Sequence, residues 1–186
     1  MPLTLNTPPA AEPVTLAEAK LHLRVDTTDD DTLITRLIAA TRARAEWHTG
    51  RAFVTQGWTL HLDAWPLDGV IELPLPPLQS VTSIVTTARD DTTTTLDPGL
   101  TIVDTASAPA RIALAENTAP PTNLRAINGI AVTFTAGYGD ASTVPAPIKE
   151  AILDLTAAMY TNRGDLPEEL PFDALALLAP YRILKI

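Results

Sequence analysis

Residues 29–50, DDDTLITRLIAATRARAEWHTG, are the stretch that decides the fold. Their apolar side chains recur every three or four residues, which places them on one stripe of an amphipathic helix. That stripe consists of Leu33, Ile34, Leu37, Ile38, Thr41 and Ala45. Gly50 predicts the end of the helix, because glycine takes the left-handed conformation common after helices at little cost. A single helix cannot bury such a stripe alone, so the pattern predicts partner helices elsewhere in the chain.

The partner helices are predicted at both ends of the chain. Thr15 and Glu18 have the spacing of a capping box, in which each side chain bonds to an otherwise unpaired backbone amide at a helix start. A second apolar stripe follows two prolines late in the chain and consists of Ile148, Ile152, Leu155 and Met159. Asp173 predicts the start of a last short helix through Leu178, which Pro180 ends. Helices from the two ends should therefore pack together.

Between these helices the helical period disappears, and β-branched and aromatic residues gather in short runs separated by proline, glycine and aspartate. Strands are predicted over residues 54–62, 70–73, 81–87, 100–103, 111–114 and 130–136. Pro74, Pro76 and Pro77 predict a chain crossing or a sheet edge, because proline donates no hydrogen bond to a neighbouring strand. Residues 92–95 are predicted to form a tip between strands, and residues 97–99 a turn.

The predicted fold class is therefore α+β. The N- and C-terminal segments form a small antiparallel helical bundle, and an antiparallel β sheet or barrel is inserted between them. The expected parts are an extended N-terminal arm (1–13), a helical core (14–52 and 145–180), a β-rich insertion (53–144) and a C-terminal docking tail (181–186). Trp47, Trp58 and Trp65 surround the change from helix to strand and are predicted to be core residues.

Composition limits the partners of the chain. Thirteen Lys and Arg stand against 22 Asp and Glu, which gives a net charge of −9. Such a surface argues against wrapping DNA or docking on anionic lipid, although it lets a phosphate backbone pass without sticking. The absence of cysteine excludes disulfides, thiolate nucleophiles and cysteine zinc sites. Residues 1–13 do not resemble a secretory signal, and no apolar run approaches the roughly 18 residues that cross a bilayer.

The aspartates that open the decisive stretch are the first candidates for chemistry. Asp29, Asp30 and Asp31 form a carboxylate cluster of the kind that binds hard cations. Their place at a helix start favours another role, because carboxylates there meet unpaired amides and the positive end of the helix dipole. We therefore predict capping, and the alternative is a metal-dependent hydrolase that uses these three residues.

No other pattern anchors an enzyme. His22, His48 and His61 lie in different predicted elements and lack the paired spacing of a helical zinc motif, so none is predicted to bind metal. Asp63 and Asp68 flank a Trp-Pro turn and are comparable with a glycosidase pair, but aspartate is common in such turns for backbone reasons. Glycine loops for phosphates and the serine nucleophile elbow are absent from the sequence. The sequence predicts no catalytic residue, no metal site and no cofactor.

The end of the chain is the candidate binding segment. Large aliphatic residues follow the proline that ends the last helix, and such a terminus either packs back on its own domain or inserts into another chain. Tyrosine and arginine, which precede them, are enriched at interface anchors. The predicted docking tail therefore consists of Tyr181, Arg182, Ile183, Leu184, Lys185 and Ile186.

Motifs in a fixed order run along nearly the whole chain. They are VTLAEAKLHLRVD at 14–26, DD at 30–31, LI at 33–34, IAA at 38–40, Glu46, TGRA at 49–52, LPLPPLQSV at 73–81, FTAGYG at 134–139, VPAPIK at 144–149 and LAPYR at 178–182. Each motif alone reflects capping, turn or packing chemistry, but their shared order is specific. In this order the chain resembles the head-tail connector, or adaptor, family of tailed phages, prophages and gene transfer agents.

The resemblance implies a helical core with a β insertion, assembled as a homo-oligomeric ring of twelve copies beneath the portal protein of a DNA-filled head. The ring would extend the DNA channel, with DNA only as passing cargo, and would receive the tail-side stopper or terminator protein. It also implies a place in a virion or phage-like particle after assembly in the host cytoplasm, with no catalysis and no membrane. A β-rich ligand-binding module is the remaining alternative.

Overall fold

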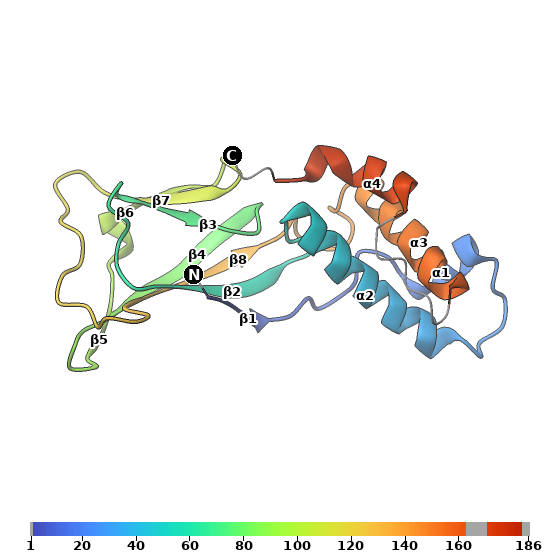
Figure 1. The fold of residues 1–186 in the computed structure, drawn as a ribbon, viewed down its shortest axis with the longest axis horizontal. Helices are drawn as coiled ribbons and strands as arrows, with labels where there is room; N and C mark the ends of the chain where they lie inside the picture. The colour runs from blue at the N-terminus through green and yellow to red at the C-terminus, as the bar shows by residue number, and fades with distance from the viewer. Residues whose placement is uncertain (1, 163–170, 184–186) are drawn as a thin grey trace. The chain divides into compact units, whose positions relative to one another are not determined.

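The structure is a computed structural model of the chain and describes residues 2–162 and 171–183. The chain folds into two compact units (Figure 1). The first unit is formed by Met1–Pro9 and Thr55–Gly137, and the second by Ala10–Val54 and Tyr138–Ile186. The first unit contains the strands and the second contains the α-helices, so the chain passes between the units three times.

Four α-helices make up the second unit. They are α1 (Leu16–Leu23), α2 (Asp31–Thr49), α3 (Ala146–Thr161) and α4 (Phe172–Leu178), and a short 3-10 turn, η2 (Ala179–Tyr181), follows α4. Within the described ranges, none of these helices is both long and apolar enough to span a membrane.

Local sequence signals set the ends of the first two helices. The Thr15 hydroxyl accepts from the Glu18 amide at 3.2 Å, and the Glu18 carboxylate accepts from the Thr15 amide at 2.7 Å, so the predicted capping box is confirmed. Gly50 ends α2 with a left-handed φ of +70°, and its amide donates to the Glu46 carbonyl at 2.8 Å. The predicted glycine stop is therefore confirmed as well.

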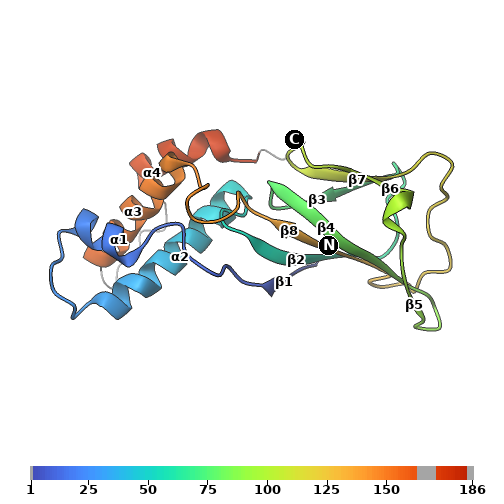
Figure 2. The ribbon, with the colours of Figure 1, turned by 180° about the vertical axis from the view of Figure 1, so that it is seen from behind.

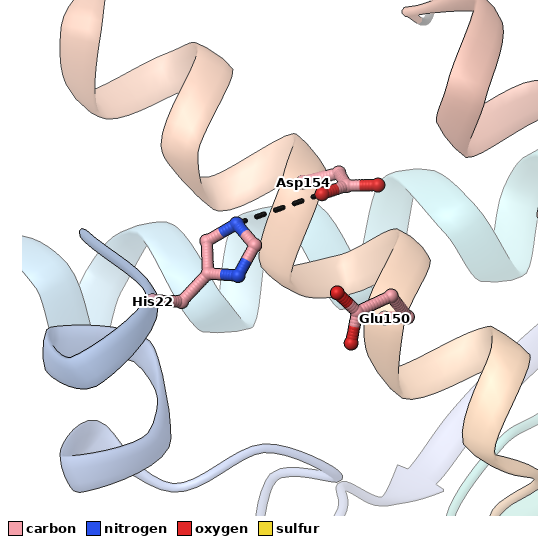
Figure 3. A group of neighbouring side chains, drawn as sticks. All are labelled: His22, Glu150 and Asp154. Atoms are coloured by element: carbon pink, nitrogen blue, oxygen red, sulfur yellow. Dashed lines mark ion pairs between the residues drawn. The ribbon is translucent and has the colours of Figure 1, made fainter.

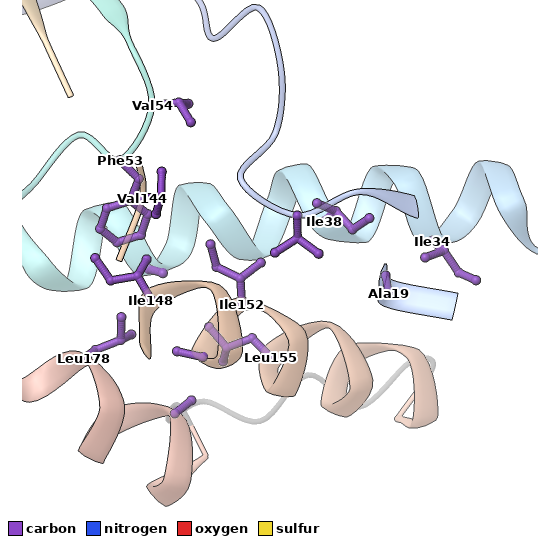
Figure 4. Packing of buried hydrophobic residues seen from close by; sticks show 14 residues of the cluster. Ala19, Ile34, Ile38, Phe53, Val54, Val144, Ile148, Ile152, Leu155 and Leu178 are labelled. Carbon is purple, nitrogen blue, oxygen red and sulfur yellow. The ribbon is translucent and has the colours of Figure 1, made fainter. Parts of the chain in front are cut away.

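The helices pack around one apolar core, which Figure 4 shows from close by. Its large side chains that are fully buried come from three helices and from the segment after α2. They are Ile34 of α2, Phe53 after α2, Leu178 of α4, and Ile148, Ile152 and Leu155 of α3. Tyr160 near the end of α3 donates a hydrogen bond to Asp30, just before α2. The hydroxyls of Thr41, later in α2, and Thr156, earlier in α3, lie 3.0 Å apart. The helices α2 and α3 therefore run in opposite directions, and helices from the two ends of the sequence pack together, as the apolar spacing predicts.

The first unit consists of two antiparallel sheets. The larger has the order β1 (Leu3–Thr7), β2 (Gln56–Leu62), β8 (Ile130–Ala136), β4 (Leu78–Thr87) and β5 (Thr93–Thr95), with β8 between β2 and β4 (Figure 2). The smaller has the order β3 (Val70–Leu73), β7 (Ala110–Leu114) and β6 (Thr101–Asp104). The described strands close no barrel, so the α+β fold class is confirmed with open sheets in place of the barrel alternative.

Alternation of apolar and polar residues explains the central strand. Every second residue of β8 is buried, beginning with Ile130, and Val132 lies opposite Leu60 of β2 and Ile84 of β4. This is the period-2 pattern of a strand with one buried face. The prolines after β3 carry the chain from the smaller sheet to β4 in the larger one, so the predicted chain crossing is confirmed.

Three local predictions are wrong. The threonine run is no tip, because Thr93–Thr95 pairs with β4 as β5. Asp173 does not cap α4, which begins at Phe172 with Pro171 in the capping position. Asp30 occupies the capping position of α2, but its side chain makes no capping hydrogen bond there. The Asp30 carboxylate instead accepts a hydrogen bond from the Tyr160 hydroxyl of α3.

Candidate assembly interface

The last described residues lie on the C-terminal end of α2, within the helical unit. The Ile183 amide donates to the Thr49 carbonyl at 2.8 Å, and Arg51 Nε donates to the Tyr181 carbonyl at 2.5 Å. A side chain added to Gly50 would lie 3.6 Å from Ile183 Cβ, so the two residues are close neighbours. Residues 181–183 thus pack back on their own unit, while Leu184, Lys185 and Ile186 lie outside the described residues.

Side chains as well as backbone hold this segment. Tyr181 and Tyr138 are both partly buried against the helical core. Burial raises the pKa of the Tyr138 hydroxyl, against the opposing effect of the nearby Arg51 charge. Arg51 therefore interacts with both tyrosines: its side chain donates to the Tyr181 carbonyl, and its charge lies near the Tyr138 hydroxyl.

A surface hollow borders the same segment. It is lined by His48 of α2, Leu175 of α4, Ala179 and Arg182. The pKa of His48 is lowered, mainly by burial and further by the Arg182 charge, so the imidazole is neutral at pH 7. The hollow thus combines apolar side chains with one neutral and one cationic hydrogen-bonding group.

Two aromatic side chains of the helical unit are exposed to solvent. Trp47 on α2 is 86% exposed and Phe172 at the start of α4 is 81% exposed. The prediction that Trp47 belongs to the core is wrong, whereas Trp65 is buried at 8% and donates its indole N–H to the Gly69 carbonyl. Large exposed aromatic residues are typical of protein interfaces. The helical period of the sequence indicates that Trp47 is exposed, because the residue lies off the apolar stripe of α2.

The structure divides the candidate metal cluster at the start of α2. Asp30 accepts a hydrogen bond from the Tyr160 hydroxyl, and Asp31 forms an ion pair with Lys20 at 2.6 Å. Among the described residues, one group brings three potential metal ligands together, and it contains none of these aspartates. That group is His22, Glu150 and Asp154 (Figure 3).

The remaining pair of carboxylates from the sequence, Asp63 and Asp68, has structural roles. The Asp63 carboxylate accepts from the Asn128 amide at 2.8 Å, and the Asp68 carboxylate accepts from the Val70 amide at 3.2 Å. The Asp68 bond stabilises a local turn, as aspartate commonly does, whereas the Asp63 bond joins two segments that lie far apart in the sequence. His48 lies on α2 and His61 on β2, and neither belongs to the one group of potential metal ligands among the described residues.

Residues 13–95 match the family model described as phage gp6-like head-tail connector protein. Solved structures match over all of this chain and 97% of theirs, at 26% identity. One belongs to the neck of an empty gene transfer agent particle computed with C6 symmetry (TM-score 0.85), one to the virion of a native particle (0.84), and one to the neck of a native particle computed with C12 symmetry (0.84). No curated protein sequence matches the chain.

These findings confirm the predicted resemblance to head-tail connectors and the predicted fold. The matched family consists of structural connectors and is not an enzyme family, so the prediction that the chain is no enzyme is confirmed. The metal-dependent hydrolase alternative loses its basis, because Asp30 and Asp31 have separate structural partners and the matched family is not an enzyme family. A structural connector role is what the sequence and the fold support.

Proposed function

We propose that this chain is a head-tail connector that forms a ring beneath the portal protein of a DNA-filled head and joins it to the tail. The observation that carries the proposal is the likeness, over the whole chain, to chains from the neck of gene transfer agent particles. The family model covers α1, α2 and the strands β2 to β5, so sequence and fold point to the same role.

A homo-oligomeric ring of twelve copies is the proposed assembly. The matched neck structures were computed with C6 and C12 symmetry, which supports a closed ring. Trp47 and Phe172 are candidates for contacts in the assembly, because burying an exposed aromatic side chain stabilises association strongly. The tail-side stopper or terminator protein is the proposed partner on the other side of the ring.

The docking tail is proposed to bind the portal protein. Its first three residues are Tyr181, Arg182 and Ile183. The Ile183 amide donates to the Thr49 carbonyl, the Arg51 side chain donates to the Tyr181 carbonyl, and the Arg182 amide closes the η2 turn. A segment fixed at its start loses less conformational entropy when its remaining residues bind. The apolar residues Leu184 and Ile186 then supply the buried surface, with Lys185 between them.

DNA is proposed to pass through the ring without binding to it. The net charge of −9 disfavours adhesion of a phosphate backbone, which is the property that a channel wall for moving DNA requires. The proposed location is the head–tail interface of a virion or phage-like particle, after assembly in the host cytoplasm.

The docking claim is tested with two variants of the tail. Replacing both Leu184 and Ile186 with serine removes the apolar surface, and replacing Lys185 with serine is the matched control at the same place. Co-sedimentation with the cognate portal protein should fail for the double variant and persist for the control. Retained binding by the double variant, with the wild-type affinity, would remove the docking claim.

The ring claim is tested by electron microscopy of the purified chain with and without the portal protein. Class averages of the complex should show a ring with twelvefold symmetry. Particles with a single copy bound, or with an open filament, would contradict the ring.

A further inference from the structure

Three potential metal ligands converge between α1 and α3 within the helical unit (Figure 3). His22 lies in the last turn of α1, and Glu150 and Asp154 lie one turn apart on α3. One ligand atom from each residue lies within 4.8 Å of the other two. The Nε2 atom of His22 is 3.5 Å from Oδ1 of Asp154, so the imidazole already faces the carboxylate.

The fold itself produces this arrangement. The capping box fixes the start of α1, and α1 packs against α3, which places its last turn beside the first half of α3. Residues four apart on a helix share one face, so Glu150 and Asp154 present their carboxylates together. Sequence inspection misses the group, because its histidine and its carboxylates come from opposite ends of the chain.

Negative charge is in excess at this place. Two carboxylates, those of Glu150 and Asp154, meet one imidazole here, with one ligand atom from each residue within 4.8 Å of the others. The Lys20 ammonium on the same helix as His22 is engaged by Asp31 at 2.6 Å. A divalent cation would compensate the negative charge of these two carboxylates.

We propose that His22, Glu150 and Asp154 bind one divalent transition-metal ion, with Zn²⁺ as the best fit, and that the ion fastens α1 to α3. One imidazole nitrogen and two carboxylate oxygens are ligands that Zn²⁺ accepts, whereas Mg²⁺ and Ca²⁺ prefer shells made of oxygen alone. This inference does not rest on the proposed function, and it revises the sequence-based prediction that His22 binds no metal.

The distances require a small closure of the side chains. Bonds of about 2.0 to 2.2 Å to Zn²⁺ place tetrahedral donors about 3.3 Å apart, which is shorter than the present limit of 4.8 Å. His22 and Glu150 are exposed and Asp154 is half-buried, so rotation of the two exposed side chains brings the donors together without moving the core. The exposed side of the group leaves room for water as a fourth ligand.

Calorimetry and thermal unfolding with Zn²⁺ test the site on the full chain, without a histidine tag and after removal of metal by a chelator. The wild-type chain should bind one equivalent, and its melting temperature should rise by about 5 °C when zinc exceeds the Kd a hundredfold. Mg²⁺ and Ca²⁺ should leave the melting temperature unchanged. The absence of cysteine removes competing thiolates.

Variants locate the binding. His22→Gln, Glu150→Gln and Asp154→Asn should each weaken zinc binding at least tenfold, and the zinc-dependent shift is compared within each variant because the first and third also break an ion pair. His61→Gln, on β2 in the other unit, is the matched control and should keep the full shift. No binding by the wild-type chain, or a full shift in His22→Gln, would overturn the proposal.

Discussion

The carboxylate of Glu46 on α2 accepts a hydrogen bond from the backbone amide of Phe53 at 2.8 Å. The same carboxylate pairs with Arg42 one turn earlier, and Arg42 also pairs with Glu12 at 2.7 Å. The side chains of Arg42 and Glu46 are only 12% and 11% exposed. This network therefore attaches two segments to α2: the one that enters the helical unit, at Glu12, and the one that leaves it, at Phe53.

Replacing Glu46 with leucine should destabilise the helical unit by about 3 kcal/mol, because it breaks a buried ion pair and leaves the Arg42 charge with Glu12 as its remaining partner. The change also leaves the buried Phe53 amide without this acceptor. Urea unfolding followed by circular dichroism measures the loss. Glu46→Gln is the matched control and should lose less, because its amide oxygen still accepts from Phe53; equal losses in the two variants would contradict the role of the charge.

Gly50→Ala should cost about 1 kcal/mol of unfolding free energy. The reason is conformational, because φ is +70° at this position and residues with a Cβ atom are strained there. Steric conflict with Ile183 contributes little, since the added Cβ would meet its neighbour at an ordinary contact distance of 3.6 Å. Gly50→Asn, which tolerates the left-handed conformation better, should lose less than Gly50→Ala in the same urea titration. The opposite order would show that packing, and not φ, decides the cost.

Thr15→Ala should destabilise α1 by about 1 kcal/mol, because the Glu18 amide loses its acceptor at the helix start. Thr15→Ser keeps the hydroxyl and should behave like the wild type. Hydrogen exchange of the α1 amides measures the change directly, and exchange rates that do not differ between the two variants would contradict the capping role.

The contribution of Glu18 should depend on pH. Hydrogen bonds from the Thr15 amide and hydroxyl lower the pKa of the Glu18 carboxyl from its ordinary value of 4.5. A carboxyl whose pKa is lower in the folded state contributes stability above the unfolded pKa and loses it as the pH falls through the folded value. The difference in unfolding free energy between the wild type and Glu18→Gln should therefore be constant from pH 7 to about pH 5 and shrink below pH 4.5. A difference that stays constant down to pH 3.5 would contradict this prediction.

Local signals in the sequence predicted the elements whose ends depend on nearby residues. The Thr15 and Glu18 capping box, the Gly50 stop and the alternation of β8 act over a few residues, so the sequence contains their whole physical cause. The strand β1 had no such signal. Most of its residues are exposed, and pairing with β2 through the backbone is what makes it a strand.

The candidate sites depend more on tertiary structure. Asp30 and Asp31 lie at a helix start, where aspartate is common. Their carboxylates bond instead to Tyr160 and Lys20, which folding brings close. The group of His22, Glu150 and Asp154 likewise exists only once α1 lies on α3. By contrast, the place of Trp47 off the apolar stripe indicates its exposure, whereas the core prediction rested on its place near the change from helix to strand.

Substitution of Trp47 distinguishes an effect on the stability of the single chain from an effect on assembly. Because the side chain is 86% exposed, Trp47→Ser should change the unfolding free energy of the single chain by no more than about 0.5 kcal/mol. Trp65→Ser, at a site that is 8% exposed, should cost about 3 kcal/mol or more and is the comparison for a buried tryptophan. If Trp47 is buried between copies in the ring, Trp47→Ser should weaken self-association at least tenfold, because interface tryptophans commonly contribute about 2 kcal/mol or more. Sedimentation velocity over a concentration series measures this, and unchanged association would place Trp47 outside the ring contacts.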